Sequence, residues 1–201
     1  PRTAARPRRQ PRRAAVHGRR SRAPRPRCRP RHRHGARPRR RRPADRSSHV
    51  NLDHAGVRVA LPTGWEARAR LQPSNRPGAR GNLLLHAATV PLPAERGDFG
   101  SGVVELLGPD DVFLSLFEYD RADAGKALFA AQGLPALRPS DFSTKHLQRT
   151  ADGRSGGQWF FQVAGRPFCL FVVLGSHSRR AAGAARASAL LFRTTVKELS
   201  G

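Results

Sequence analysis

Cys169 and His177 are the two residues whose types could best supply a nucleophile and its general base. Catalysis by cysteine needs a thiolate in an electropositive and partly exposed setting. Cys169 instead lies between Phe168 and Leu170 in an apolar run, where a thiol behaves as a small hydrophobic group. We therefore expect Cys169 to be structural, and a small enzyme that uses Cys169 and His177 is kept as an alternative.

Carboxylates and serines give weaker signals for catalysis. Glu118 and Asp120 share one strand face, as paired catalytic carboxylates would, but they lie beside a polar turn, where solvated charge is expected. Ser101 and Ser155 lack the G-x-S-x-G pattern of a nucleophile elbow. The Gly-Ser-Gly at 100–102 also lacks the third glycine of a dinucleotide-binding fingerprint.

Two groups of residues have side chains that could ligate a metal ion: His86, His146 and His177, and Cys28, His32 and His34. The spacing of the first group gives no ligand pattern. The second group lies among arginines in RPRCRPRHRHGARPRRRRP (25–43) and has no second ligand cluster to complete a zinc site. We therefore predict no catalytic, cofactor-binding or metal-binding residues, and no cofactor.

Most of the net charge of +24 lies in residues 1–50, which contain 20 arginines and one acidic residue, Asp45. This segment has no Leu, Ile, Phe, Tyr or Trp. Without apolar side chains it cannot offset the entropy of ordering, so we predict that it is disordered. Residues 51–201 hold 18 Lys and Arg against 13 Asp and Glu, an ordinary balance for one domain.

Three interpretations of residues 1–50 remain open. An arm that binds nucleic acid would use arginine–phosphate contacts, although the segment lacks the aromatic residues that stack on single-stranded bases. A transit peptide would need an apolar face, which is missing. We favour a non-native upstream reading of GC-rich DNA, because the segment is rich in residues with GC-rich codons and the chain contains no Met.

Regular patterns of secondary structure begin near residue 51. The alternation of Val57, Val59 and Leu61 with polar or small residues predicts a strand, and Trp65 after the following turn is a candidate core residue. Further strands are predicted over 67–71, 83–90, 112–119, 158–163 and 168–174, and an edge strand within 192–199. The strand at 112–119 is expected inside the sheet, and the one at 168–174 is expected to be covered on both faces.

Helices are expected in three places, over 102–107, as a single turn over 126–131, and from the capping residue Ser178 to Leu191. In the last helix, Ala182, Ala185 and Ala189 are expected to lie against the sheet. Arg179, Arg186 and Arg193 recur every seven residues, which favours a solvated face, with an anion- or protein-docking surface as the alternative.

These elements predict an α+β fold for residues 51–201, in which a mostly antiparallel sheet of five to seven strands has helices packed on at least one face. No membrane span is predicted, because the longest strongly apolar run, residues 168–174, falls far short of the about 20 residues that a spanning helix needs.

Five stretches of the sequence resemble an uncharacterised family of small actinobacterial proteins: VRVALPTGWEAR (57–68), HAATVPLP (86–93), GDFGSG (97–102), DVFLSLFEYD (111–120) and RPFCLFVVLGSHSRR (166–180). The resemblance spans nearly all of residues 57–196 and none of 1–50. It implies a start shortly before Val57, which favours the upstream reading of residues 1–50. The opening strand also resembles Mog1/PsbP-like domains, which implies an α/β/α sandwich. The resemblance transfers no activity and no functional residue.

The sequence favours a non-enzymatic, cytoplasmic interaction or accessory domain with a protein partner, because its core is well patterned and no convergent catalytic set is visible. Non-specific nucleic-acid binding is expected only through residues 1–50 and is one alternative. The enzyme that uses Cys169 and His177 is the other.

Overall fold

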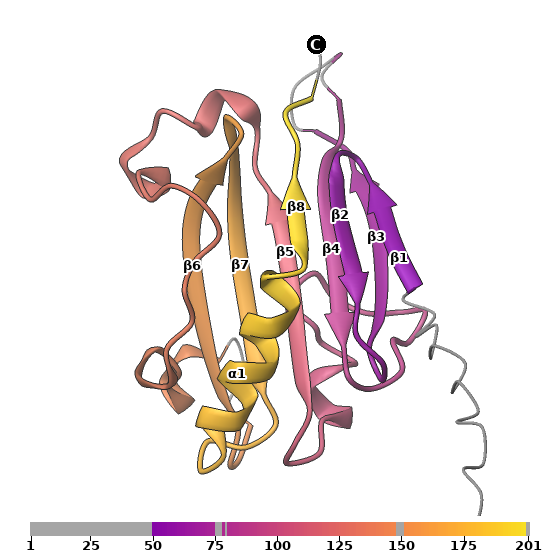
Figure 1. Ribbon diagram of the computed structural model, residues 1–201, viewed down its shortest axis with the longest axis vertical. Coiled ribbons are helices and arrows are strands. Elements are labelled where there is room, and N and C mark those ends of the chain that lie inside the picture. Colours follow the sequence, from indigo (N-terminus) through magenta and orange to yellow (C-terminus); the bar gives the residue numbers. More distant parts are fainter. Residues whose placement is uncertain (1–49, 75–77, 79, 148–150, 200–201) are drawn as a thin grey trace, which may run out of the picture. The chain divides into compact units, whose positions relative to one another are not determined.

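Eight β-strands in two antiparallel sheets form the framework of the computed structural model over the residues that it describes, 50–74, 78, 80–147 and 151–199 (Figure 1). These residues belong to one of the two compact units of the chain, Asp45–Gly201. The larger sheet contains, in spatial order, β3 (Glu66–Gln72), β4 (Asn82–Ala88), β5 (Val112–Glu118), β7 (Arg166–Leu174) and β6 (Ser155–Val163). The smaller sheet contains β1 (Val50–His54), β2 (Val57–Leu61) and β8 (Thr194–Val196).

The middle of the larger sheet is built from the two most apolar segments of the sequence. All nine residues of β7 are buried, and β5 is buried at six of its seven positions. Both strands pair on each side, so the prediction of an interior strand at 112–119 and of a doubly covered strand at 168–174 is confirmed. Strands that are apolar on both sides are expected where both faces of a sheet are covered.

One face of the larger sheet is covered by α1 (Arg180–Leu191) and by the smaller sheet, which lie in front of it in Figure 1. Side chains from alternate positions of β4, β5 and β7, such as Leu85, Leu114 and Leu170, form the main core with them. Trp65 packs at the margin of this core and is only partly buried.

The opposite face is covered by irregular chain and short 3₁₀ turns. A second apolar cluster forms here between β5 and β7 and the 89–111 connection, and it contains Phe113, Phe171 and Val173 together with Val103 and Leu107. The connection includes η1 (Val104–Leu106). Residues 119–147 include η2 (Arg121–Asp123), η3 (Ala127–Phe129), η4 (Pro139–Asp141) and η5 (Thr144–His146). Of these turns, η4 contacts α1, and Phe142 next to it belongs to the main core.

The hairpin predicted around residues 164–167 is confirmed, although its turn is shorter than expected. β6 and β7 are joined by Ala164 and Gly165 alone, with φ values of 53° and 67°. Positive φ at both positions is the geometry of the tight hairpin turns that match strand twist. The short turn lets Arg166 and Pro167 enter β7.

Several element predictions need correction. The described residues contain eight strands rather than five to seven, because β1 was not expected, and one α-helix where several packed helices were expected. The helix predicted over 102–107 is the single 3₁₀ turn η1, between Gly102 with a positive φ and Pro109. None of the described helices is long and apolar enough to cross a membrane.

The predicted capping and facing of the last helix are wrong. α1 begins after Arg179, and the hydroxyl of Ser178 pairs instead with that of Ser176 at 2.9 Å. The buried positions of the helix are Ala184, Ala187, Leu190 and Leu191, whereas Ala182, Ala185 and Ala189 are exposed. Each buried alanine lies two residues after a predicted one, which corresponds to a rotation of about 200° around the helix. Because the leucines at the end of the helix are buried on that side, the predicted alanines face solvent.

A buried ion pair joins the two sheets at one end. Arg166 donates from Nε and Nη2 to the two carboxylate oxygens of Glu118 at 2.7 and 2.8 Å, and from Nη1 to the carbonyl of Lys197, just after β8, at 3.1 Å. The backbone N–H of Leu83 in β4 also donates to Glu118 at 3.1 Å. The prediction of a solvated Glu118 is therefore wrong, because an arginine from the neighbouring strand compensates its charge inside the protein.

Candidate functional site

A cavity of about 370 Å³ opens on the face of the larger sheet that is opposite α1. Six apolar side chains line it: Phe99, Val104, Leu147, Ala151, Phe171 and Val173. Four polar residues complete the lining: Asp98, Ser101, Glu105 and Arg154. The floor of the cavity therefore comes from β7, one wall comes from the 97–105 segment, and the other comes from Leu147, Ala151 and Arg154.

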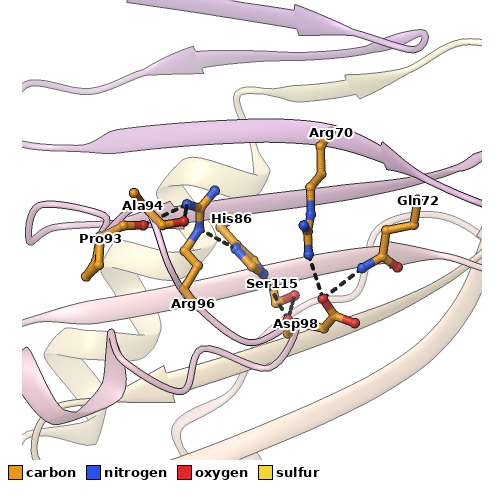
Figure 2. Close-up of polar contacts among 8 residues, drawn as sticks. All are labelled: Arg70, Gln72, His86, Pro93, Ala94, Arg96, Asp98 and Ser115. Carbon is orange, nitrogen blue, oxygen red and sulfur yellow. Dashed lines mark hydrogen bonds and ion pairs between the residues drawn. The ribbon is translucent and has the colours of Figure 1, made fainter.

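Two polar side chains from otherwise apolar strands of the larger sheet form hydrogen bonds to the 97–105 wall. His86 in β4 and Ser115 in β5 are direct cross-strand partners. Both contact the carbonyl oxygen of Asp98, His86 through Nε2 at 2.9 Å and Ser115 by donating from its hydroxyl at 2.7 Å (Figure 2). The two strands thus provide the partners that a buried loop carbonyl requires.

The other nitrogen of His86 fixes the tautomer of the ring. Arg96 donates from Nε to His86 Nδ1 at 2.8 Å, so Nδ1 accepts and Nε2 carries the proton that it donates to Asp98. Burial and, to a smaller extent, the positive charge of Arg96 lower the pKa of His86 to about 4, although the hydrogen bond to the Asp98 carbonyl opposes the shift. His86 is therefore neutral at pH 7, and each of its nitrogens already has a partner.

Side chains from the edge strand β3 hold the Asp98 carboxylate. Arg70 donates from Nη2 to Asp98 Oδ1 at 3.0 Å, and Gln72 donates from Nε2 to the same oxygen at 2.7 Å (Figure 2). Arg96 meanwhile donates to the carbonyl of Pro93 at 2.8 Å. Asp98 is thus bound at both its backbone and its side chain, which fixes the position of the cavity wall.

Gly100 is required by the close approach of this wall to the sheet. Its φ is +86°, in the region that favours glycine, and a Cβ at this position would collide with the ring of Phe113. Phe99 then reaches across the cavity to Phe171, with ring centroids 5.7 Å apart in an edge-to-face arrangement. This geometry is one that aromatic pairs prefer.

Arg154 joins the two walls and supplies a cation to the cavity. It donates from Nη2 to the carbonyls of Leu107 at 3.0 Å and of Glu105 at 3.3 Å. Its Nε is buried without a hydrogen-bond partner, and within the described part of the chain Arg154 forms no ion pair. The Glu105 carboxylate turns away to accept the N–H of Gly102 at 2.7 Å.

The structure does not bring Cys169 and His177 together. Cys169 is 1% exposed in the middle of β7, where Gln158 donates to its Sγ at 3.2 Å, and burial raises the pKa of its thiol. His177 lies beyond the end of β7, where its backbone N–H donates to the carbonyl of Gly153. The five residues from Cys169 to the end of the strand alone span about 17 Å, so His177 cannot act as base for this thiol.

The other predicted candidates are also separated from one another. Ser101 lies on the cavity rim, whereas Ser155 is buried at the start of β6 and its hydroxyl has no hydrogen-bond partner. Asp120 accepts from the N–H of Ala122 at 3.0 Å as the cap of η2, and Glu118 belongs to the buried ion pair.

Among the described residues no group of three or more His, Cys, Asp and Glu could hold a metal ion. His86 is enclosed by its loop contacts, and His146 is exposed in η5. Cys28, His32 and His34 lie outside the described residues.

The arginine repeat at the last helix is exposed, as the solvated interpretation predicts, but two of its members contact one loop. Arg179 forms an ion pair of 2.7 Å with the Asp110 carboxylate, and Arg186 donates to the Asp110 carbonyl at 2.8 Å. Arg193 lies past the end of α1. These contacts tie the helix to the turn before β5.

Sequence reasoning missed both the loop anchor and Arg154. A signal for the anchor exists, because His86 in NLLLHAA and Ser115 in VFLSLFE each interrupt an apolar strand. Two such interruptions that pair across neighbouring strands indicate a shared polar partner. Arg154 precedes β6 in a Gly-rich stretch, and no local pattern distinguishes it from the other arginines of the chain.

Comparisons with known proteins give no match: no family model, no curated protein and no solved structure is similar to this chain.

Proposed function

We propose that residues 51–201 form a non-enzymatic accessory domain that binds a small ligand in the cavity between β7 and the 97–105 wall. The observation that carries this proposal is the cavity itself, which has a volume of about 370 Å³ and is lined by two aromatic rings. It also contains a cation, Arg154, that has no ion-pair partner among the described residues. Mostly apolar concave sites with a few convergent polar groups are the usual sites of small-molecule binding.

Binding is favoured over catalysis because the ionisable groups around the cavity are already engaged. Both ring nitrogens of His86 have partners, and Asp98 Oδ1 accepts two hydrogen bonds. A general base must reach the proton that it abstracts and have a pKa near the working pH. His86, with a pKa of about 4 and no free nitrogen, meets neither requirement.

The enzyme alternative that uses Cys169 and His177 is not favoured, since β7 separates the two residues. A protein partner remains part of the proposal, because an accessory domain can report its ligand to another protein. Nucleic-acid binding through residues 1–50 stays a separate proposal, and its support is the arginine content of that segment alone.

Membership of the small actinobacterial family is likewise proposed, on the five stretches that resemble it. These stretches contain the strands β2, β5 and β7 and most of residues 86–102, including His86 and Asp98. They therefore include the strand that forms the floor of the cavity and part of one wall. We propose a cytoplasmic location as well, because the two cysteines of the chain suggest no disulfide framework.

The cavity can be tested with a neutral aromatic probe, 1-naphthol, by isothermal titration calorimetry and ligand-observed NMR. We expect saturable one-to-one binding to the wild-type protein. Val104→Trp should abolish it by filling the cavity, since Val104 is a lining residue. Leu106→Trp is the matched control, because Leu106 lies in the same 3₁₀ turn but is 54% exposed.

Equal binding of 1-naphthol to both folded tryptophan variants would place the probe elsewhere and refute the cavity as the binding site. Absence of binding to the wild-type protein would also count against the proposal. Thermal melts of the three proteins serve as the control for folding.

A further inference from the structure

Arg154 is the one cationic side chain among the described residues that line the cavity. Its guanidinium donates only to backbone carbonyls, and no ion pair with it is found over the described ranges. The Asp98 carboxylate, by contrast, is balanced by Arg70 at 3.0 Å and by the amide of Gln72 at 2.7 Å. The cavity therefore contains a cation that has no anionic partner in the part of the chain that the structure describes.

The donors of Arg154 are also incompletely used. A guanidinium has five N–H donors and a planar shape that matches a carboxylate. The two hydrogen bonds of Arg154 both start from Nη2. Its Nε is buried out of reach of solvent, so Nη1, which donates to no acceptor among the described residues, is the donor that remains for a ligand.

We propose that the cavity binds a small monocarboxylate with an apolar, preferably aromatic, body, and that Arg154 holds its carboxylate. This inference rests on the proposed function and specifies its ligand. The body would lie against Phe99 and Phe171, whose rings are 5.7 Å apart and line the cavity together with Leu147. The carboxylate would accept the hydrogen bonds that Arg154 does not make within the protein.

The acidic side chains of the lining favour a single negative charge on the ligand. Glu105 lines the cavity without an ion-pair partner in the described part of the chain, and its carboxylate accepts only a backbone N–H. A dianion such as a phosphate monoester would be repelled by Glu105 more strongly than a monocarboxylate. A cationic ligand would leave Arg154 without an acceptor.

The test compares four naphthalene probes that share one aromatic body on the wild-type protein: 1-naphthoate, neutral 1-naphthamide, 1-naphthyl phosphate and 1-naphthylmethylammonium. Dissociation constants are measured by calorimetry at fixed ionic strength. We expect 1-naphthoate to bind at least about tenfold more tightly than 1-naphthamide, a ratio that corresponds to about 1.4 kcal/mol. The phosphate and the ammonium should bind more weakly than 1-naphthoate.

Variants then assign the carboxylate preference to one residue. Arg154→Gln should lower the affinity for 1-naphthoate at least about tenfold, to that of 1-naphthamide, and leave the affinity for 1-naphthamide unchanged. Arg193→Gln is the matched control, because this substitution removes the same charge from the chain at an exposed residue that does not line the cavity. This control should keep the wild-type preference.

The outcomes separate this inference from the proposed function. If 1-naphthamide and 1-naphthoate bind the wild-type protein equally and Val104→Trp abolishes both, the cavity binds ligands but the inference about the carboxylate is overturned. If no probe of any charge binds, the proposed function fails and the inference fails with it. The comparison of probes on the wild-type protein needs no variant, so it remains decisive even if Arg154→Gln does not fold.

Discussion

Protonation of His86 should destabilise the fold at mildly acidic pH. The pKa of His86 is lowered to about 4 in the folded protein, chiefly by burial, whereas an unfolded histidine has a pKa of about 6.5. Unfolding therefore takes up a proton between these two values, so stability is highest above pH 6.5 and falls as the pH decreases toward 4. The structural cause is direct, because a protonated Nδ1 would face the Arg96 donor that it now accepts.

The size of this effect follows from the two pKa values. Proton linkage gives a loss of about 2 kcal/mol in the free energy of unfolding between pH 7.5 and pH 5. For a domain of this size such a loss lowers the melting temperature by roughly 4 to 8 °C. Below pH 4 the contribution of His86 should level off, because both states are then protonated.

His86→Gln is the variant that isolates this titration. A glutamine can keep one acceptor for Arg96 and one donor for the Asp98 carbonyl, and it does not titrate. Urea denaturation of both proteins at pH 7.5, 6.5, 5.5 and 5.0 measures the difference, since the remaining titratable groups are common to the two. Parallel loss of stability in the wild-type protein and in His86→Gln would refute the reasoning.

Two further predictions concern groups buried elsewhere in the domain. Cys169 should react with iodoacetamide only as the domain unfolds, because burial raises the pKa of its thiol; labelling of the native protein as fast as of the urea-unfolded protein would contradict this. Glu118→Ala should cost about 3 to 5 kcal/mol in urea denaturation because it leaves Arg166 buried without its partner, whereas the double variant Glu118→Leu/Arg166→Met should recover much of that loss. Equal destabilisation by the single and double variants would show that the cost comes from packing rather than from unpaired charge.

The strands of the larger sheet could be predicted from the sequence because each has a strong local pattern. The segments at 112–119 and 168–174 are apolar on both faces, and the structure places both inside the sheet. β1 was missed because VNLDH contains little apolar alternation, and its strand conformation depends on pairing with β2 over five positions. Such pairing is a tertiary effect that propensity does not reveal.

The facing of α1 shows how a local pattern can mislead. Ala182, Ala185 and Ala189 have helical spacing and small side chains, as expected for close packing. Ala184, Ala187 and Leu191 have the same spacing, and the larger apolar area of the leucine decides which set is buried. Two equivalent periodic sets were present, and the side-chain volume at the end of the helix decided between them.

The candidate site could not be predicted because it depends on contacts between distant segments. Arg154 contacts the carbonyls of residues more than 40 positions earlier, and His86 contacts Asp98 only once the 89–111 connection has folded back over β4. Nothing in the local sequence specifies these approaches. The interrupting residues His86 and Ser115 indicate that a buried polar partner exists, but not which loop provides it.

The covering of the larger sheet opposite α1 explains why the cavity forms there. On the α1 face, regular elements present closely spaced apolar side chains, which interdigitate as protein interiors usually do. On the other face the cover is irregular chain, whose carbonyls must find donors, so part of the sheet surface is occupied by His86 and Ser115 instead of packing groups. The hydrogen bonds from His86 and Ser115 therefore set the position of the 97–105 segment. Phe99 packs edge to face on Phe171, and the cavity remains open beside the two rings. A ligand that enters this space would bury the exposed part of Phe99 and offer an acceptor to Arg154, which gains both apolar burial and a charge-assisted hydrogen bond.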